Sequence, residues 1–217
     1  MKQSSKTQGD TVGRILNAAE TLFVVHGFAD TSMRMITQRA QVNLAAINYY
    51  FASKDALFQR VFIRRLNPFI DKLLAQYQAL QVVPGKIGVE TIVEVLFTSL
   101  LRLQAEDAGG GFVIVRLLSR TLVESHEGLS KVLPNYCAPL VERLLSLLQQ
   151  ALPHLEEATL KWRLYFALTS VIHAFAGNDL LNLLDKGEAI AMDIAQIARQ
   201  LQLVMVASLS APTMIID

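Results

Sequence analysis

The sequence has little glycine and proline, with only 11 Gly and 6 Pro among its 217 residues. Together these two residues usually make up roughly 12% of a chain, which is clearly more than here. A β-sheet protein of this length would need more turn residues, so the composition predicts an all-α protein. It also excludes collagen-like, low-complexity and disordered chains. The length suits one large domain or two small ones.

Cysteine and long apolar runs are also scarce. Cys137 is the only cysteine, so it cannot pair within the chain, and we predict a buried structural thiol. No Cys/His spacing fits a zinc site, and we expect neither a metal nor another cofactor. No window reaches the roughly 18 uninterrupted apolar residues of a membrane span, and the polar start does not resemble a signal peptide. We therefore expect a soluble cytoplasmic protein with no membrane partner.

Motifs of the common enzyme classes are absent as well. The sequence contains no G-x-S-x-G, P-loop, G-x-G-x-x-G or H-E-x-x-H spacing. The glycines at 109–111 follow no predicted strand, and Glu156 and Glu157 are sequence neighbours that cannot face each other across a cleft. The prediction is that the protein is not an enzyme.

The net charge of +1 conceals an uneven distribution of charge. Residues 1–66 hold nine Lys or Arg against four Asp or Glu, whereas the remainder holds eleven against fifteen. A basic segment joined to an acidic one suggests a nucleic-acid-binding head on a larger body, although solvated helix faces are the alternative.

Apolar residues recur with the period of amphipathic helices along the whole chain. In the first half, helices are predicted over about 10–27, 32–40, 44–50 and 53–80, with Asp10 as a candidate N-cap. Pro68 lies inside the fourth of these and is expected to kink it. Further helices are predicted over about 87–105, 112–125, 129–151, 156–177 and 188–209.

The two short helices over 32–40 and 44–50 form a candidate helix-turn-helix. In that motif the second helix lies in the major groove, where Asn pairs with adenine and Ala or Leu touches a thymine methyl. A phenol or an ammonium suits phosphate oxygens. Candidate base contacts come from Asn43, Leu44, Ala45, Ala46 and Asn48, and candidate phosphate contacts from Tyr49, Tyr50 and Lys54. The alternative is a helical hairpin with a solvated polar face.

The residues themselves carry a more specific signal. The chain reads ILNAAETLF at 15–23, HGF at 26–28, TS at 31–32 and VNLAAINYYFASKDAL at 42–57. These segments closely resemble the DNA-binding head of the TetR family of transcriptional regulators. Gln41 departs from the family pattern, which usually has glycine in the turn, so a positive φ there would cost backbone strain.

The resemblance implies a head at 1–52, a ligand-binding and dimerising body at 53–217, and a homodimer on double-stranded operator DNA. Carried over by position, Tyr49 and Lys54 would grip phosphate, Thr31 or Ser32 would cap a helix and contact the backbone, and residues 43–48 would read bases. A ligand in each body would change the separation of the two heads. The segment 42–58 is similar to the fatty-acid-responsive branch of the family.

The body offers candidate ligand contacts but no outlined pocket. Arg116 and Arg120 follow Phe112 on an apolar segment. They would meet an acidic ligand group, pair with a neighbouring glutamate or reach solvent. Trp162, Phe166 and His173 are further candidates, with core or subunit interface as the alternative.

The last two helices, 156–177 and 188–209, combine small and apolar residues and are predicted to form the dimer interface. The aliphatic body predicts a hydrophobic effector, such as a fatty acid or an acyl-CoA, that releases a repressor from its operator. A multidrug-sensing repressor and a helical adaptor without DNA binding are the alternatives.

Overall fold

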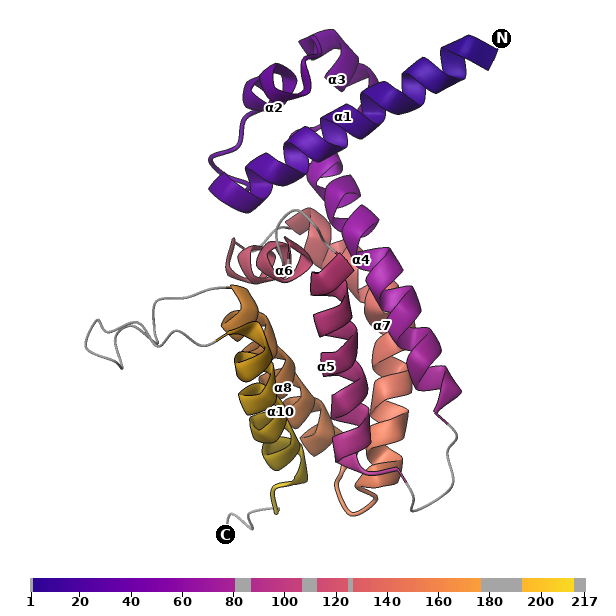
Figure 1. Ribbon diagram of the computed structural model, residues 1–217, viewed down its shortest axis with the longest axis vertical. Helices are drawn as coiled ribbons and strands as arrows, with labels where there is room; N and C mark the ends of the chain where they lie inside the picture. Colours follow the sequence, from indigo (N-terminus) through magenta and orange to yellow (C-terminus); the bar gives the residue numbers. More distant parts are fainter. Residues whose placement is uncertain (1, 81–86, 107–112, 125–126, 177–192, 213–217) are drawn as a thin grey trace, which may run out of the picture. The chain divides into compact units, whose positions relative to one another are not determined.

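The structure is a computed structural model that describes residues 2–80, 87–106, 113–124, 127–176 and 193–212 (Figure 1). Within these ranges, the side chains of residues 2–9, 120–124, 127, 130 and 176 are not described. Every element in the described ranges is an α-helix, which confirms the predicted all-α fold. The helices are α1 (Lys2–His26), α2 (Met33–Ala40), α3 (Leu44–Tyr50), α4 (Lys54–Ala79), α5 (Val89–Glu106), α6 (Val113–Glu124), α7 (Glu127–Ala151), α8 (Glu157–Ala176) and α10 (Ile194–Ser210).

Contacts divide the chain into two compact units. The first unit comprises Met1–Pro68 and Arg120–Pro134, and the second comprises Phe69–Ser119 and Asn135–Asp217. The predicted head, 1–52, lies entirely within the first unit, which also includes the start of α4.

The core of the first unit forms around the apolar face of α1. Ile15, Ala19 and Phe23 are fully buried, as their helical spacing predicted. Ile36 of α2 and Ile47 of α3 are buried as completely. The rings of Phe23, Phe28 and Phe58 pack against one another, with centroids 4.8–6.0 Å apart. Each short helix therefore buries one apolar anchor and leaves its other side outside the core.

The ends of α1 differ in how well the sequence located them. The predicted end at Gly27 is confirmed, because Gly27 follows the last helical residue and has a φ of 82°. The predicted start near Asp10 is wrong, because α1 already begins at Lys2. Asp10 is not an N-cap but lies inside the helix, where its carboxylate is 3.6 Å from the guanidinium of Arg14. Residues 2–9 have no apolar stripe, which was the only signal available in the sequence.

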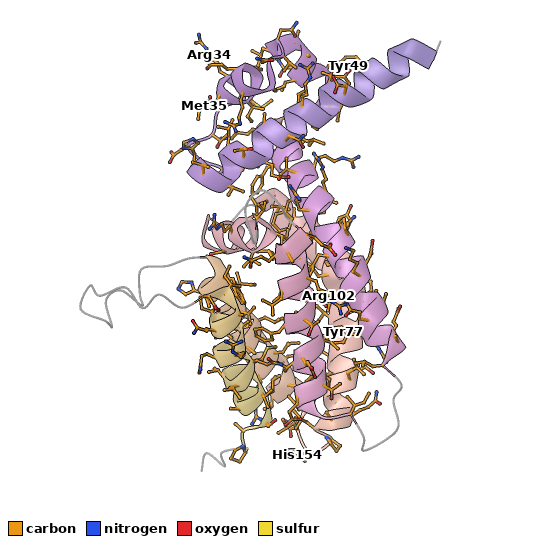
Figure 2. All side chains as sticks on the ribbon, in the orientation of Figure 1. Arg34, Met35, Tyr49, Tyr77, Arg102 and His154 are labelled. Carbon is orange, nitrogen blue, oxygen red and sulfur yellow. The ribbon has the colours of Figure 1, made fainter. Side chains whose placement is uncertain are left out.

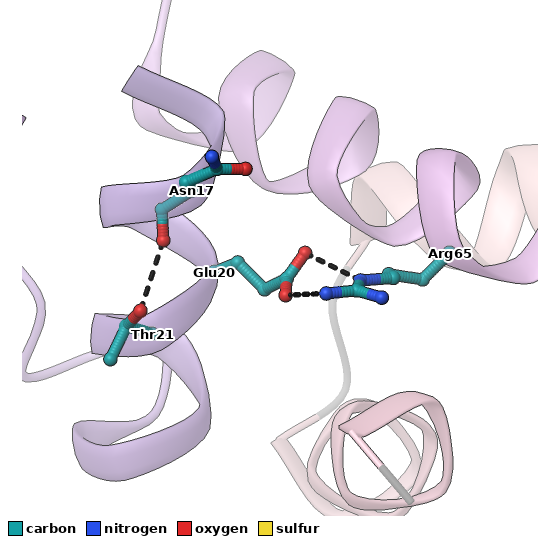
Figure 3. Close-up of polar contacts among 4 residues, drawn as sticks. All are labelled: Asn17, Glu20, Thr21 and Arg65. Atoms are coloured by element: carbon teal, nitrogen blue, oxygen red, sulfur yellow. Dashed lines mark hydrogen bonds and ion pairs between the residues drawn. The ribbon is translucent and has the colours of Figure 1, made fainter. Parts of the chain in front are cut away.

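An ion pair joins α1 to α4 inside the first unit (Figure 3). Arg65 Nε donates to Glu20 Oε2 at 2.7 Å, and Arg65 Nη2 donates to Glu20 Oε1. Glu20 is only 8% exposed, although it is charged. One turn of α1 further along, the Thr21 hydroxyl donates to the carbonyl of Asn17. The paired guanidinium explains how α1 can carry a carboxylate on its packed side.

In the second unit, α7 holds the end of α4. The Arg143 guanidinium of α7 donates to the carbonyl of Tyr77 at 3.0 and 3.1 Å, and to that of Leu80 at 3.4 Å. These carbonyls have no partner within the helix, so a cation there completes the helix end. The Tyr77 hydroxyl donates to Ile92 O of α5, and its burial raises the pKa of the phenol.

Helices α8 and α10 pack against each other, and α10 also packs against α5 (Figure 1). Their inward residues, such as Leu164, Ala167 and Leu209, are buried. Cys137 of α7 is half-buried, and desolvation raises the pKa of its thiol, which suits the predicted structural role. No helix in the described ranges combines the length and the apolar character that a membrane span requires.

Candidate nucleic-acid interface

Helices α2 and α3 begin with side-chain caps at the positions that a helix-turn-helix requires. The Ser32 hydroxyl accepts a hydrogen bond from Met35 N at 3.2 Å, which confirms that Ser32 is the N-cap of α2. Asn43 Oδ1 accepts from Ala46 N at 2.7 Å and caps α3 in the same way. Asn43 was predicted to contact bases, and its carbonyl oxygen is already used by the helix. Its amide nitrogen is the group left for a base.

The turn between α2 and α3 depends on a left-handed residue. Gln41 has φ 54° and ψ 47°, the positive φ that the departure from glycine raised as a concern. The backbone closes as a Schellman motif, with Gln41 N donating to Gln38 O and Val42 N donating to Thr37 O. A glutamine therefore occupies a conformation that glycine adopts without strain.

Helix α3 presents its predicted reading face to the outside. Ile47 points into the core, while Leu44 is 52% exposed and Tyr49 is 75% exposed. Asn43, Ala45 and Asn48 are also exposed, and Ala46 and Tyr50 are half-buried. The rings of Tyr49 and Tyr50 meet edge to face, with centroids 5.0 Å apart. Figure 2 labels Tyr49 on α3 and Arg34 on α2. The predicted base and phosphate contacts thus share one accessible surface of the first unit.

Thr31 and Lys54 have structural roles beside this surface. Thr31 is fully buried, and its hydroxyl donates to Gly27 O at 2.7 Å, so of the pair Thr31 and Ser32 only Ser32 is exposed. Lys54 Nζ donates to the carbonyls of Phe28, Ala29 and Thr31 at 2.9, 3.4 and 3.0 Å. The same ammonium lies 4.2 Å from the centroid of the Phe28 ring. Lys54 therefore holds the loop before α2.

Sequence reasoning missed the cations of α2 and α1. Arg34 and Arg39 are exposed on α2, on either side of its buried residues. Arg14 of α1 donates to Ala40 O, at the end of α2, at 3.4 Å. Their charge was visible in the sequence, but attention to α3 alone left them out. They extend the positive charge of the candidate interface beyond Lys54.

The predicted ligand contacts are not gathered around a described cavity. Trp162 and Phe166 are 63% and 56% exposed on α8, where their rings stack on each other. His173 of α8 and Arg116 of α6 are also exposed. Phe112 and the side chain of Arg120 lie outside the described residues. Arg116 thus takes the alternative of reaching solvent. In the described part of the chain, no cluster of His, Cys, Asp or Glu is suited to hold a metal.

A capped helix pair with an exposed polar and cationic face, carried by an all-helical chain, defines a helix-turn-helix DNA-binding protein. The family profile described as "Bacterial regulatory proteins, tetR family" matches residues 15–61. A second profile, "Tetracyclin repressor-like, C-terminal domain", matches residues 94–208. The chain belongs to the TetR family of transcriptional regulators.

Known proteins resemble the chain at two levels. A probable HTH-type transcriptional regulator of Bacillus subtilis (strain 168), YttP, is 41% identical over 51 residues, which are 24% of this chain and 25% of that protein. A TetR-like transcriptional regulator from Rhodococcus sp. RHA1 has a TM-score of 0.60 and 19% identity, covering 93% of this chain and 97% of that one. The fatty acid degradation regulator FadR from Bacillus halodurans has a TM-score of 0.62 and 15% identity, covering 93% and 99%. At these identities, the two structures establish the fold alone.

Proposed function

We propose that the protein is a homodimeric repressor that binds an inverted-repeat operator and is released by a hydrophobic small molecule. The observation that carries the proposal is the accessible face of α3, flanked by the exposed cations of α2. A DNA duplex offers both the phosphates and the base edges that these side chains suit. Two such heads related by two-fold symmetry would read half-sites about 34–36 Å apart.

In this proposal the residues of the first unit divide into two groups. Ser32, Tyr49, Tyr50 and Lys54 contact phosphates, and the exposed cations Arg34 and Arg39 add to the attraction. Asn43, Leu44, Ala45, Ala46 and Asn48 face the major groove and set base preference. Thr31 keeps the loop in place beneath them, because its buried hydroxyl is bonded to Gly27 O.

The outer face of α8 and α10 supports dimerisation. Five large apolar side chains are more than half exposed there: Trp162, Tyr165, Phe166, Leu203 and Val204. Exposed apolar side chains gathered in this way are typical of a protein–protein interface. Two helices from each subunit would form a four-helix contact, as the sequence predicts. We therefore assign Trp162 and Phe166 to the subunit contact, in place of the predicted ligand lining.

For the effector, we favour a fatty acid or its coenzyme A thioester. The body is rich in aliphatic residues, and buried apolar area contributes roughly 25 cal/mol per Å² to binding an alkyl chain. Phe112 would contact that chain, while Arg116, Arg120 or His173 would meet its polar head group. The Bacillus halodurans FadR, similar in fold, is a fatty acid degradation regulator. An effector releases DNA only if it binds one head separation better than the other.

Two measurements test the proposal. Electrophoretic shifts on operator duplexes selected from a random pool should show binding that falls steeply with salt concentration. Native mass spectrometry of the purified protein should then identify an acyl compound that releases the selected operator. Release by a polycyclic dye but not by acyl compounds would favour a multidrug sensor. Failure to select any duplex would favour a helical adaptor.

A further inference from the structure

Helix α1 begins well before the part of the chain that matches the family. It starts at Lys2, whereas the matched segment starts at residue 15 and the first fully buried side chain is Ile15. Residues 2–9, called here the N-terminal arm, read KQSSKTQG and contain no apolar residue. The core of the first unit therefore offers the arm no apolar contact.

The charges of the arm oppose the helix that carries it. Lys2 and Lys6 give the arm a charge of +2, and the first turn of α1 contains no acidic residue. Cations are disfavoured at a helix N-terminus, where the unpaired backbone N–H groups are already positive. Gly9 and Gly13 lower the helix propensity further. The chain itself thus supplies little to stabilise a polar cationic helix, whereas an external polyanion would do so.

The arm leaves the first unit beside the helix-turn-helix. Arg14, one turn after Asp10, donates to Ala40 O at the end of α2. This bond ties α1 to the turn between α2 and α3. In Figure 1 the N-terminal end of α1 projects past both of these helices. A duplex held against α3 would therefore continue into the region that the arm reaches.

We propose that the N-terminal arm binds the sugar–phosphate backbone of DNA adjacent to each half-site. Lys2 and Lys6 supply the charge, and the Ser, Thr and Gln side chains of the arm supply donors for phosphate oxygens. Such contacts carry no base preference, so the arm raises affinity and lengthens the bound site without altering the sequence that is read. The inference rests on the proposed DNA-binding function.

The test compares two double variants of the full chain that remove the same charge. Lys2→Gln with Lys6→Gln neutralises the arm, and Lys72→Gln with Arg102→Gln neutralises two exposed cations of the second unit. Binding to a mixed-sequence duplex is measured over a range of salt concentrations. Each lost phosphate contact should lower the slope of log K against log salt by about 0.9, so the arm variant should lose up to about 3.6 in a dimer. The control should keep the wild-type slope.

Hydroxyl-radical footprints on the selected operator give a second readout. The wild-type protein should protect sugars outside the half-sites, and the arm variant should lose only that outer protection. The midpoint of thermal unfolding should stay the same, because the arm has no part in the core. An unchanged slope and footprint in the arm variant would overturn the inference and leave the proposed function standing. A wild-type protein that binds no duplex would overturn both.

Discussion

Glu20 and Arg65 lie 45 positions apart in the chain, yet their side chains form a two-pronged ion pair between α1 and α4 (Figure 3). The carboxylate is nearly buried, while the guanidinium side chain is about a third exposed. Both oxygens of Glu20 accept from the fork of the arginine, which is the geometry of a strong charge-assisted bond. The pair fixes α4 against the helix that supports the reading surface.

We predict that Arg65→Ala lowers the free energy of unfolding by about 2–3 kcal/mol, because it leaves a nearly buried carboxylate without its fork. Urea denaturation measures the change. The matched control is Lys161→Ala, which removes the exposed ion pair with Glu157 and should cost less than about 1 kcal/mol. Equal losses in the two variants would show that Glu20 is adequately solvated without Arg65.

The sequence predicted the helices well wherever an apolar stripe marked them. Ile15, Ala19 and Phe23 announced α1, and Ile36 and Ile47 anchor the two short helices. Partners distant in sequence, such as Glu20 and Arg65, have no local signature, so a single sequence does not reveal them. The same holds for α8, which is apolar on several faces. Leu164 is buried and Phe166 is exposed, and the periodic pattern does not separate them.

The functional residues show the same division. The outward residues of α3 followed from the helical period, once Ile47 was recognised as the inward one. The bonds of Lys54 to three loop carbonyls did not follow, because they depend on how the loop before α2 folds back. A side chain chosen for its charge can thus have a structural role that the sequence conceals.

Lys54→Ala should therefore affect both stability and DNA binding. The loop carbonyls of Phe28 and Thr31 lose a charged donor, so we expect a loss of about 2 kcal/mol in the free energy of unfolding. The proposed phosphate contact predicts weaker binding to all sequences alike and a smaller salt slope. Both are measured at a temperature where the variant is folded. A changed base preference with an unchanged salt slope would contradict the assigned role.

The two asparagines of the reading helix should respond differently to substitution. Asn43→Ala removes the cap of α3 and should cost about 1 kcal/mol, whereas Asn43→Ser keeps a capping oxygen and most of the stability. Asn48→Ala should leave stability nearly unchanged, because Asn48 is exposed and is not the cap. Both Asn43→Ser and Asn48→Ala should shift the selected operator sequence, by about 1–3 kcal/mol for a good amide–base pair. Selection from a random pool would reveal an unaltered operator if neither residue reads bases.

Glycine at two nearby glutamines should have opposite effects. Gln41→Gly removes the strain of a left-handed residue, offset in part by a more flexible unfolded chain, so we expect a gain of about 0.5–1 kcal/mol. Gln38→Gly places glycine inside α2 and should cost about 1 kcal/mol. Thermal unfolding compares the two variants directly. Destabilisation by Gln41→Gly would mean that the glutamine side chain contributes more than its backbone strain costs.

The exposed face of α8 and α10 leads to the last prediction. If two copies pair there about a two-fold axis, a substitution enters the interface twice. Phe166→Glu should then bury two unpaired carboxylates and weaken dimerisation by about 3 kcal/mol or more, which is roughly a hundredfold or greater rise in the dimer dissociation constant. The protomer should keep its fold, because Phe166 is largely outside its core. Light scattering should change from a dimer to a monomer at micromolar concentration.

Val141→Glu is the control for this substitution, since Val141 is an exposed apolar residue on α7. It should leave the dimer intact. Operator affinity should fall with dimerisation in Phe166→Glu, because each head then binds its half-site without the help of a tethered partner. A dimer that survives Phe166→Glu, or a wild-type protein that is already monomeric, would move the subunit contact away from this face. Trp162 and Phe166 would then again be candidates for binding a ligand.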